Sequence, residues 1–196
     1  MVLAAGLGRR YPGKLATPLD GRPLIAHVLD VADAAVRAGD LDRVLVVVGV
    51  GTAAARDAET VRAVVSSHAF DIVENDDPAA GVSRSVQVAL TALGSTPVDG
   101  ALMMLGDQPR VSLDVVRDIL AIWRASRPSF VTPRYEVGGS GNPVLLDRSA
   151  WPLAARLEGD TGMVAVTRMH PELVTYVDVH GANPDVDTPE DLAALG

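Results

Sequence analysis

Basic side chains gather in one glycine-containing segment near the start of the chain, and such a segment could bind an anion. The segment "LAAGLGRRYPGKLATPL" contains Arg10 and Lys14, and Lys14 is the only lysine in the chain. A lysine ammonium is a compact charge that binds phosphate, and glycines let backbone amides approach the same group closely. The residues expected to hold a triphosphate are Gly6, Gly8, Arg10 and Lys14.

Two better-known glycine motifs do not fit this segment. A P-loop needs serine or threonine after the lysine, because the hydroxyl binds magnesium, but Leu15 stands there and Pro18 interrupts the helix that should follow. A dinucleotide-binding fingerprint needs a third glycine where this chain has Tyr11, and Pro12 disturbs the helix that would begin there. The segment is therefore predicted to be a phosphate-binding loop of another kind, placed directly after a first strand.

Short apolar runs alternate with segments of helical periodicity along the whole chain. A continuous apolar run such as "RVLVVVGV" is typical of a strand that is covered on both faces. The expected strands are 1–5, 43–50, 70–74, the run "GALMML" before Asp107, 129–132, a strand after the glycine-rich "YEVGGSGN", and 173–179. The expected helices are 23–38, 52–68, 83–93, a helix capped by Ser112 and running to 125, 151–157, 163–169, and one from 189 onward.

This alternation predicts an α/β fold. We expect a single domain, residues 1–196, with a mostly parallel sheet and helices on both faces in a Rossmann-like arrangement. Ligands of such sheets bind beyond the carboxyl ends of the strands. The loop of Lys14 and the turn of Asp107 both follow predicted strands, so both should face the ligand.

The composition excludes several classes of function. The chain has no cysteine, so it can form no disulfide, thiolate metal site or cysteine nucleophile. No apolar run approaches the roughly 20 residues needed to cross a bilayer, and no targeting segment is recognised, so we expect a cytoplasmic protein. A net charge of −8 argues against nucleic acid as a partner. The four histidines show no spacing typical of a metal site.

The opening segment and five later blocks, in order, resemble the MobA-like nucleotidyltransferases, and in particular the molybdenum cofactor cytidylyltransferases. The later blocks are "ENDDPAAGVSRSV", "LGDQP", "GNPVLL", "LEGDTG" and "NPDVDTPEDL". In this family a nucleotidyl group passes from an NTP to a phosphate of a pterin cofactor, and pyrophosphate is released. The resemblance implies Mg²⁺, an NTP and a phosphorylated pterin-type small molecule as ligands, and a molybdoenzyme or its chaperone as protein partner.

The resemblance also implies which carboxylates bind the metal. Attack on an α-phosphate is catalysed mainly by positioning and countercharge, so a carboxylate is needed at the ligand crevice. Asp107 is expected to bind Mg²⁺ there. The resemblance favours Asp185 as the second metal ligand, and Asp187 is expected to cap the last helix.

Further residues are assigned to the nucleotide by the same resemblance. Arg10 and Lys14 would contact the β- and γ-phosphates and neutralise pyrophosphate as it leaves, while Arg9 would face solvent. The residues expected around the base and ribose are Ala4, Ala5, Gly6, Gly81 and Ser85. Because the family pairs Ala-Ala-Gly with cytidylyl transfer and Ala-Gly-Gly with guanylyl transfer, Ala5 favours CTP.

The chain departs from the family pattern at three places. The loop between Arg10 and Lys14 is one residue shorter than usual, and fewer apolar residues precede "LAAG", as if the chain began later than its relatives. Met163 and Val164 follow "GDTG" where the family commonly has Ala-Arg, which removes a cation for the acceptor's phosphate. Two alternatives stay open: an NAD(P)H-dependent oxidoreductase of the nicotine-blue type on the same fold, and a nucleotide- or pterin-binding protein without catalytic activity.

Overall fold

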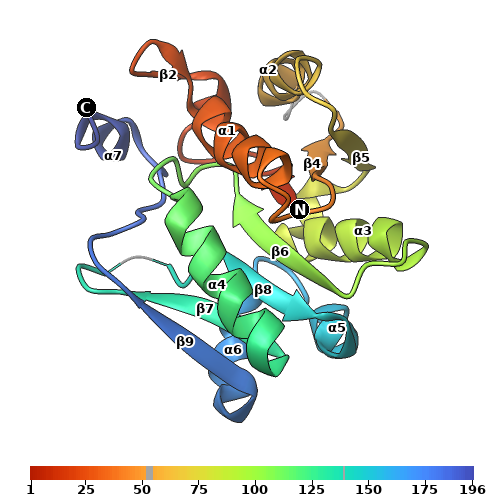
Figure 1. Ribbon diagram of the computed structural model, residues 1–196. Helices are drawn as coiled ribbons and strands as arrows, with labels where there is room; N and C mark the ends of the chain where they lie inside the picture. Colours follow the sequence, from red (N-terminus) through yellow and green to blue (C-terminus); the bar gives the residue numbers. More distant parts are fainter. Residues whose placement is uncertain (52–54, 139) are drawn as a thin grey trace.

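The computed structural model describes residues 1–51, 55–138 and 140–196. Its main feature is a seven-stranded sheet (Figure 1). In order across the sheet, its strands are β5 (Asp71–Asn75), β4 (Leu45–Gly49), β1 (Val2–Ala4), β6 (Gly100–Leu105), β8 (Val144–Asp147), β7 (Phe130–Tyr135) and β9 (Val174–Val179). Neighbouring strands are parallel except where β8 pairs with β6 and β7. The mostly parallel α/β fold expected from the sequence is therefore confirmed.

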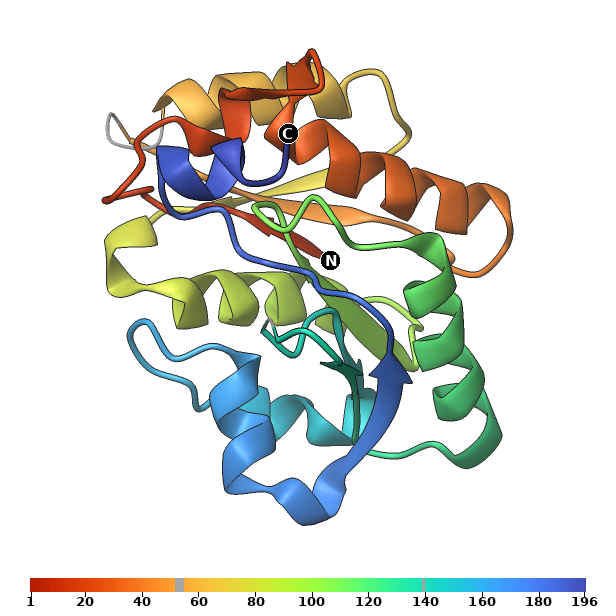
Figure 2. The same cartoon turned by 90° about the vertical axis from the view of Figure 1, so that its left-hand side faces the viewer.

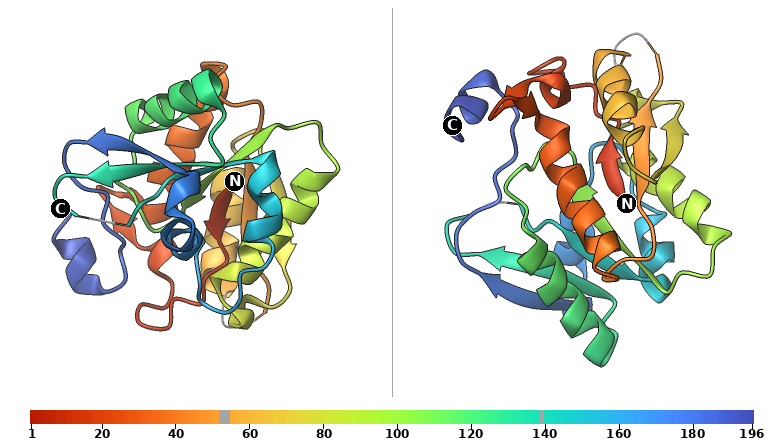
Figure 3. Two further views of the ribbon diagram at one scale, coloured as in Figure 1. Left: turned by 90° about the horizontal axis from the view of Figure 1, so that it is seen from below. Right: turned by 45° about the horizontal axis from the view of Figure 1, so that its top comes forward.

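Helices cover both faces of this sheet, as predicted. One layer contains α1 (Leu24–Arg37), α2 (Ala55–Val65) and α4 (Leu113–Ser126), and the other contains α3 (Val82–Gly94), α5 (Trp151–Ala154) and α6 (Met163–Met169). Figure 2 shows α1 and α2 above the strands and α3 below them, and Figure 3 shows the same arrangement from two further sides. Val2 and Ala4 of β1 pack into the first layer and Leu3 into the second, which is the two-residue alternation of a strand buried on both faces.

The helices form where apolar periodicity and end signals agree. In α1 the fully buried residues Leu24, Val28 and Leu29 recur at helical spacing, and Gly39 follows the helix with a φ of 77° that favours glycine. Before α4 the hydroxyl of Ser112 accepts a hydrogen bond from the amide of Val115 at 3.3 Å, so the predicted cap is confirmed.

Two helix boundaries differ from the expected ranges. The helix expected over 52–68 is described from Ala55 to Val65, and residues 52–54 lie outside the described part of the chain. The helix expected over 151–157 ends at Ala154. Beyond it, the amides of Arg156 and Leu157 donate to the carbonyls of Leu153 and Ala154, three residues back and not four as in an α-helix. No described helix is both long and apolar enough to cross a membrane.

Two short elements bring distant parts of the chain together beside β1. A hairpin of β2 (Pro18–Leu19) and β3 (Arg22–Pro23) follows the N-terminal loop. The chain after β9 crosses the molecule and ends in α7 (Pro189–Ala193), which lies next to the N-terminal loop (Figure 2). The loop before the hairpin and the segment before α7 therefore meet beyond the carboxyl end of β1.

Candidate functional site

A cavity of about 340 Å³ lies beyond the carboxyl ends of β1 and β6. Such a position is expected for the ligand site of a parallel sheet. The predicted site residues that line it are Ala4, Ala5, Gly6, Gly8, Arg10, Lys14, Gly81, Ser85 and Asp107. Residues that the sequence did not assign to the site also line it, among them Leu3, Leu105, Asp160 and Asp187.

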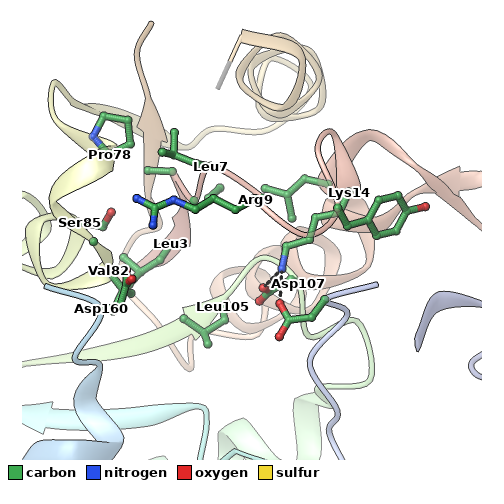
Figure 4. Close-up of a pocket in the computed structure, with 18 of the residues that line it drawn as sticks. Leu3, Leu7, Arg9, Lys14, Pro78, Val82, Ser85, Leu105, Asp107 and Asp160 are labelled. Atoms are coloured by element: carbon green, nitrogen blue, oxygen red, sulfur yellow. Dashed lines mark hydrogen bonds and ion pairs between the residues drawn. The ribbon is translucent and has the colours of Figure 1, made fainter. Parts of the chain in front are cut away.

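Lys14 lies at one end of this cavity and is fully hydrogen-bonded. Its ammonium donates to Asp107 Oδ2 at 2.6 Å and to Asp187 Oδ1 at 3.0 Å (Figure 4). It also donates to the carbonyl of Val186 at 2.8 Å. The Lys14 side chain is only 11% exposed. Burial lowers its pKa, but the carboxylates of Asp107 and Asp187 outweigh burial, and the pKa of Lys14 is raised. The lysine is therefore a charged, partly buried cation held by two carboxylates.

Asp187 belongs to this cluster and not to the helix cap. It also accepts a hydrogen bond from the guanidinium of Arg10. The cap of α7 is Thr188, whose hydroxyl accepts from the amide of Asp191 at 3.2 Å while the Asp191 carboxylate accepts from the amide of Thr188 at 2.8 Å. The prediction that Asp187 caps the last helix is wrong, because this reciprocal pair already satisfies the helix end.

Asp185 lies behind the cluster, outside the residues that line the cavity. Its Oδ1 accepts a hydrogen bond from Gln108 Nε2 at 2.8 Å. Burial, and then the nearby charge of Asp107, raise the pKa of Asp185. That Asp185 binds a metal stays a prediction. Asp187, and not Asp185, shares the Lys14 ammonium with Asp107.

The turn that carries Lys14 is held by a residue that sequence reasoning missed. Lys14 to Ala16 form a 3₁₀ turn after Gly13, whose φ is 79°. The buried carboxylate of Asp57, in the first turn of α2, accepts a hydrogen bond from the amide of Ala16 at 3.2 Å. The pKa of Asp57 is raised, because burial outweighs the lowering effect of this bond and of a second one from the Leu15 amide. From sequence, Asp57 could only be interpreted as an acid near a helix start.

The other end of the cavity combines apolar walls with a few polar side chains. Leu3, Pro78 and Val82 give it apolar walls, and Ser85 and Asp160 add polar atoms (Figure 4). The hydroxyl of Ser85 accepts a hydrogen bond at 3.0 Å from Asn75, which is fully buried. Asn75 stands in the block "ENDDPAAGVSRSV" but was not assigned to the site.

Arg9 spans the space between the two ends. It is exposed, as predicted, yet it also lines the cavity, and its guanidinium extends toward Ser85 (Figure 4). The prediction that it faces solvent is therefore incomplete.

Gly81 lines the cavity next to Val82 and cannot carry a side chain without displacing its neighbours. Its φ is 96°, and a Cβ would overlap the carbonyl of Gly159 and lie 2.6 Å from the amide of Asp160. We expect Gly81→Ala to lower the free energy of unfolding by about 2–4 kcal/mol. Gly39→Ala is the matched control, since its φ is 77° and nothing lies within 4 Å of its Cβ position; it should cost about 1 kcal/mol. Equal losses for the two variants in urea denaturation would contradict the overlap.

The acidic end could exchange its ammonium for a metal ion. Asp107 and Asp187 each place one oxygen within 3.0 Å of the Lys14 nitrogen, so the two carboxylates already share one cation. Within residues 1–51, 55–138 and 140–196, no group of three or more His, Cys, Asp or Glu side chains could hold a metal. Mg²⁺ commonly takes one or two carboxylates and completes its shell with water and substrate phosphates. The donor set fits a metal that binds together with a phosphorylated ligand.

The chain is similar to known proteins in sequence and in structure. The model of the MobA-like NTP transferase domain matches residues 1–174. The chain is 33% identical over 123 residues to the bifunctional protein GlmU of Nitrosomonas europaea, a match that covers 61% of this chain and 24% of that protein. It thus spans about a quarter of the length of this curated relative.

Two solved structures share the fold. The structure of Rv0371c from Mycobacterium tuberculosis H37Rv, in complex with manganese, is similar with a TM-score of 0.79 at 30% identity, covering 99% of this chain and 95% of that one. CMP:2-keto-3-deoxy-manno-octonic acid synthetase, complexed with CTP, has a TM-score of 0.73 at 16% identity, with 99% and 95% covered. The second likeness concerns the fold alone.

Proposed function

The chain belongs to the MobA-like NTP transferase family, and we propose from this premise that it transfers a nucleotidyl group from CTP to a phosphorylated small molecule, with Mg²⁺ as cofactor. The observation that carries the proposal is the arrangement of one cavity. Arg10, Lys14, Asp107 and Asp187 meet at its charged end, and the predicted base and ribose residues line the rest. A nucleoside triphosphate has the matching distribution of charge.

Asp107 and Asp187 would hold the metal. When bound, Mg²⁺ supplies positive charge to the α-phosphate and to the leaving pyrophosphate. The two carboxylates come from chain segments 80 residues apart that the hydrogen bond from the Val186 amide to the Asp107 carbonyl, 2.9 Å long, joins directly. This bond brings the two segments together before any ligand arrives, and this lowers the cost of organising the site.

Lys14 and Arg10 would neutralise the phosphates. Both side chains are paired with Asp187, and we expect them to contact the β- and γ-phosphates instead once the carboxylates hold a metal. An oxygen of the acceptor phosphate then bonds to the α-phosphorus, and the bond from the α-phosphorus to the bridging oxygen breaks. The departing pyrophosphate keeps the electron pair of that bond, and Lys14 and Arg10 stabilise its charge.

The choice of nucleotide and acceptor is proposed from the family blocks. Ala5 is buried at the cavity wall, where the Ala-Ala-Gly pattern favours CTP over GTP. A phosphorylated pterin of the molybdenum cofactor type is the proposed acceptor. Val164, which stands in place of the arginine of the family's Ala-Arg pair, gives the acceptor no charge. The expected protein partner, a molybdoenzyme or its chaperone, and the cytoplasmic location remain predictions.

The direct test is pyrophosphate release. The full chain is incubated with Mg²⁺ and each of CTP, GTP, ATP and UTP, with and without molybdopterin and a panel of other phosphorylated acceptors. We expect release that depends on metal and acceptor and is fastest with CTP. Release from no NTP with any acceptor, together with oxidation of NADH or NADPH, would support the oxidoreductase alternative instead.

Nucleotide binding can be tested without knowing the acceptor. CTP with Mg²⁺ at about 100 times its Kd should stabilise the protein by about 2.7 kcal/mol. For a domain of this size, that raises Tm by about 5–10 °C. The measurement is differential scanning fluorimetry with CTP, GTP and NADPH in parallel. Stabilisation by NADPH alone would contradict the proposal.

A further inference from the structure

One buried amide joins the chain segments that carry the two metal-binding carboxylates. Gln108 directly follows Asp107 and is only 1% exposed. Its Nε2 donates to Asp185 Oδ1 at 2.8 Å and also to the hydroxyl of Ser140. Its Oε1 accepts from Asn183 Nδ2 at 3.4 Å. Both donor hydrogens and the acceptor of this amide are therefore in use.

These bonds join residues that lie next to the two carboxylates of the cavity in the sequence. Asp107 and Gln108 are neighbours, and Asp185 is two residues before Asp187, so the side-chain bond between Gln108 and Asp185 limits how far the two carboxylates of the cavity can separate. The backbone bond from Val186 to Asp107 alone would leave the segment free to rotate about it. Asn183, which is fully buried, adds a second bond to the same amide and holds the start of the segment.

We propose that Gln108 is a positioning residue that sets the spacing of Asp107 and Asp187 through its hydrogen bond to Asp185. This inference rests on the proposed function, in which Asp107 and Asp187 bind the metal. It gives Asp185 the role of an anchor for the segment. Residues that orient metal ligands in this way commonly change metal affinity by 10- to 100-fold when they are replaced.

The chemistry of the amide explains why glutamine stands at this position. A carboxylate at Asp185 needs a donor, and a second buried carboxylate beside it would repel it. Gln108→Glu has nearly the same shape, but it removes the donor to Asp185 and adds a charge. Gln108→Glu combined with Asp185→Asn reverses the direction of the bond, because the new amide donates to the new carboxylate. The double variant also keeps the net charge of the wild type.

The experiment measures Mn²⁺ binding to the full chain without nucleotide, by electron paramagnetic resonance of the free ion. We expect Gln108→Glu to weaken Mn²⁺ binding about tenfold, and Gln108→Glu with Asp185→Asn to return it to within about threefold of the wild type. The Mn²⁺ concentration that gives half-maximal pyrophosphate release should move in parallel, while kcat at saturating metal should recover in the double variant.

Two controls separate the possible failures. Gln108→Met keeps the length of the side chain but loses all three bonds, so it should weaken Mn²⁺ binding as Gln108→Glu does, even if its Tm is unchanged. Wild-type affinity in Gln108→Glu, or a double variant no better than the single one, overturns the positioning role alone. If the wild type binds Mn²⁺ no better than Asp107→Asn does, the proposed metal site fails, and the positioning role fails with it.

Discussion

Replacing Lys14 with methionine is expected to tighten the binding of divalent metal to the nucleotide-free protein while it slows nucleotidyl transfer by about 10²- to 10³-fold. The two effects have opposite signs because the ammonium has two roles. Without nucleotide it lies 2.6 Å from Asp107 and 3.0 Å from Asp187, at the position where a metal would bind. In the proposed reaction it balances the charge of the phosphates.

The gain in affinity follows from charge and desolvation. With Lys14→Met, Asp107 and Asp187 lose the cation that they share, so a metal ion no longer competes for their oxygens. At an effective dielectric constant of about 20, a single charge 4 Å away is worth about 4 kcal/mol before solvent compensation. We therefore expect at least a tenfold tighter Mn²⁺ affinity, measured by electron paramagnetic resonance. Methionine keeps most of the packing of the buried lysine stem.

Arg9→Met is the matched control for this variant. Arg9 has the same charge and lines the same cavity, but its guanidinium extends toward Ser85 and away from the acidic pair (Figure 4). Its removal should change Mn²⁺ affinity by less than about threefold. If Lys14→Met and Arg9→Met change the affinity equally, the effect comes from overall charge, and Lys14 does not compete with the metal.

This competition also predicts that metal and nucleotide bind cooperatively. A metal that displaces Lys14 leaves a partly buried ammonium without its carboxylates, and the triphosphate offers it new partners. The presence of either ligand should therefore increase the affinity for the other by the same factor. The coupling should largely vanish in Lys14→Met, because no ammonium has to be transferred between them.

Most of the fold could be predicted from the sequence, but not the short β2–β3 hairpin, the order of the strands or the antiparallel direction of β8. The apolar run of β4 and the helical spacing in α1 depend on local periodicity, which the sequence displays directly. The position of β8 depends on its pairing with strands that are distant in the sequence. It is inserted antiparallel between β6 and β7, which run parallel to each other, and periodicity holds no information about which strands become neighbours.

The proposed phosphate-binding part of the site could be predicted because its residues are close in sequence. The glycines and Lys14 stand in one loop, so their spacing could be compared with known motifs. Asp57 and Gln108 act through bonds to distant segments, and their roles appear only in the folded chain. For Asp187 a local signal existed: Thr188 followed three residues later by Asp191 is a capping-box pattern, which leaves Asp187 free for the cavity.

Replacing Asp107 with asparagine is expected to reduce nucleotidyl transfer by about 10³-fold or more, the largest loss among the carboxylates of the site. Asp107 follows β6 and lines the cavity, and its side chain is 22% exposed, enough to meet a ligand. Asparagine keeps the shape but removes one of the two negative charges that would hold the metal. Metal affinity and the rate of pyrophosphate release should therefore fall together.

The same measurement on three asparagine variants ranks the carboxylates. Asp187→Asn should approach the loss of Asp107→Asn, since both carboxylates contact the same cation. Asp185→Asn should cost about threefold or less, because the asparagine Oδ1 can still accept the bond from Gln108 and no metal ligand is lost. A loss in Asp185→Asn as large as in Asp107→Asn, with wild-type activity in Asp187→Asn, would instead make Asp185 the second ligand. Lys14 does not depend on these side chains for its bond to the carbonyl of Val186, so we expect the three variants to stay folded. Measuring Tm for each variant separates a loss of activity from a loss of stability.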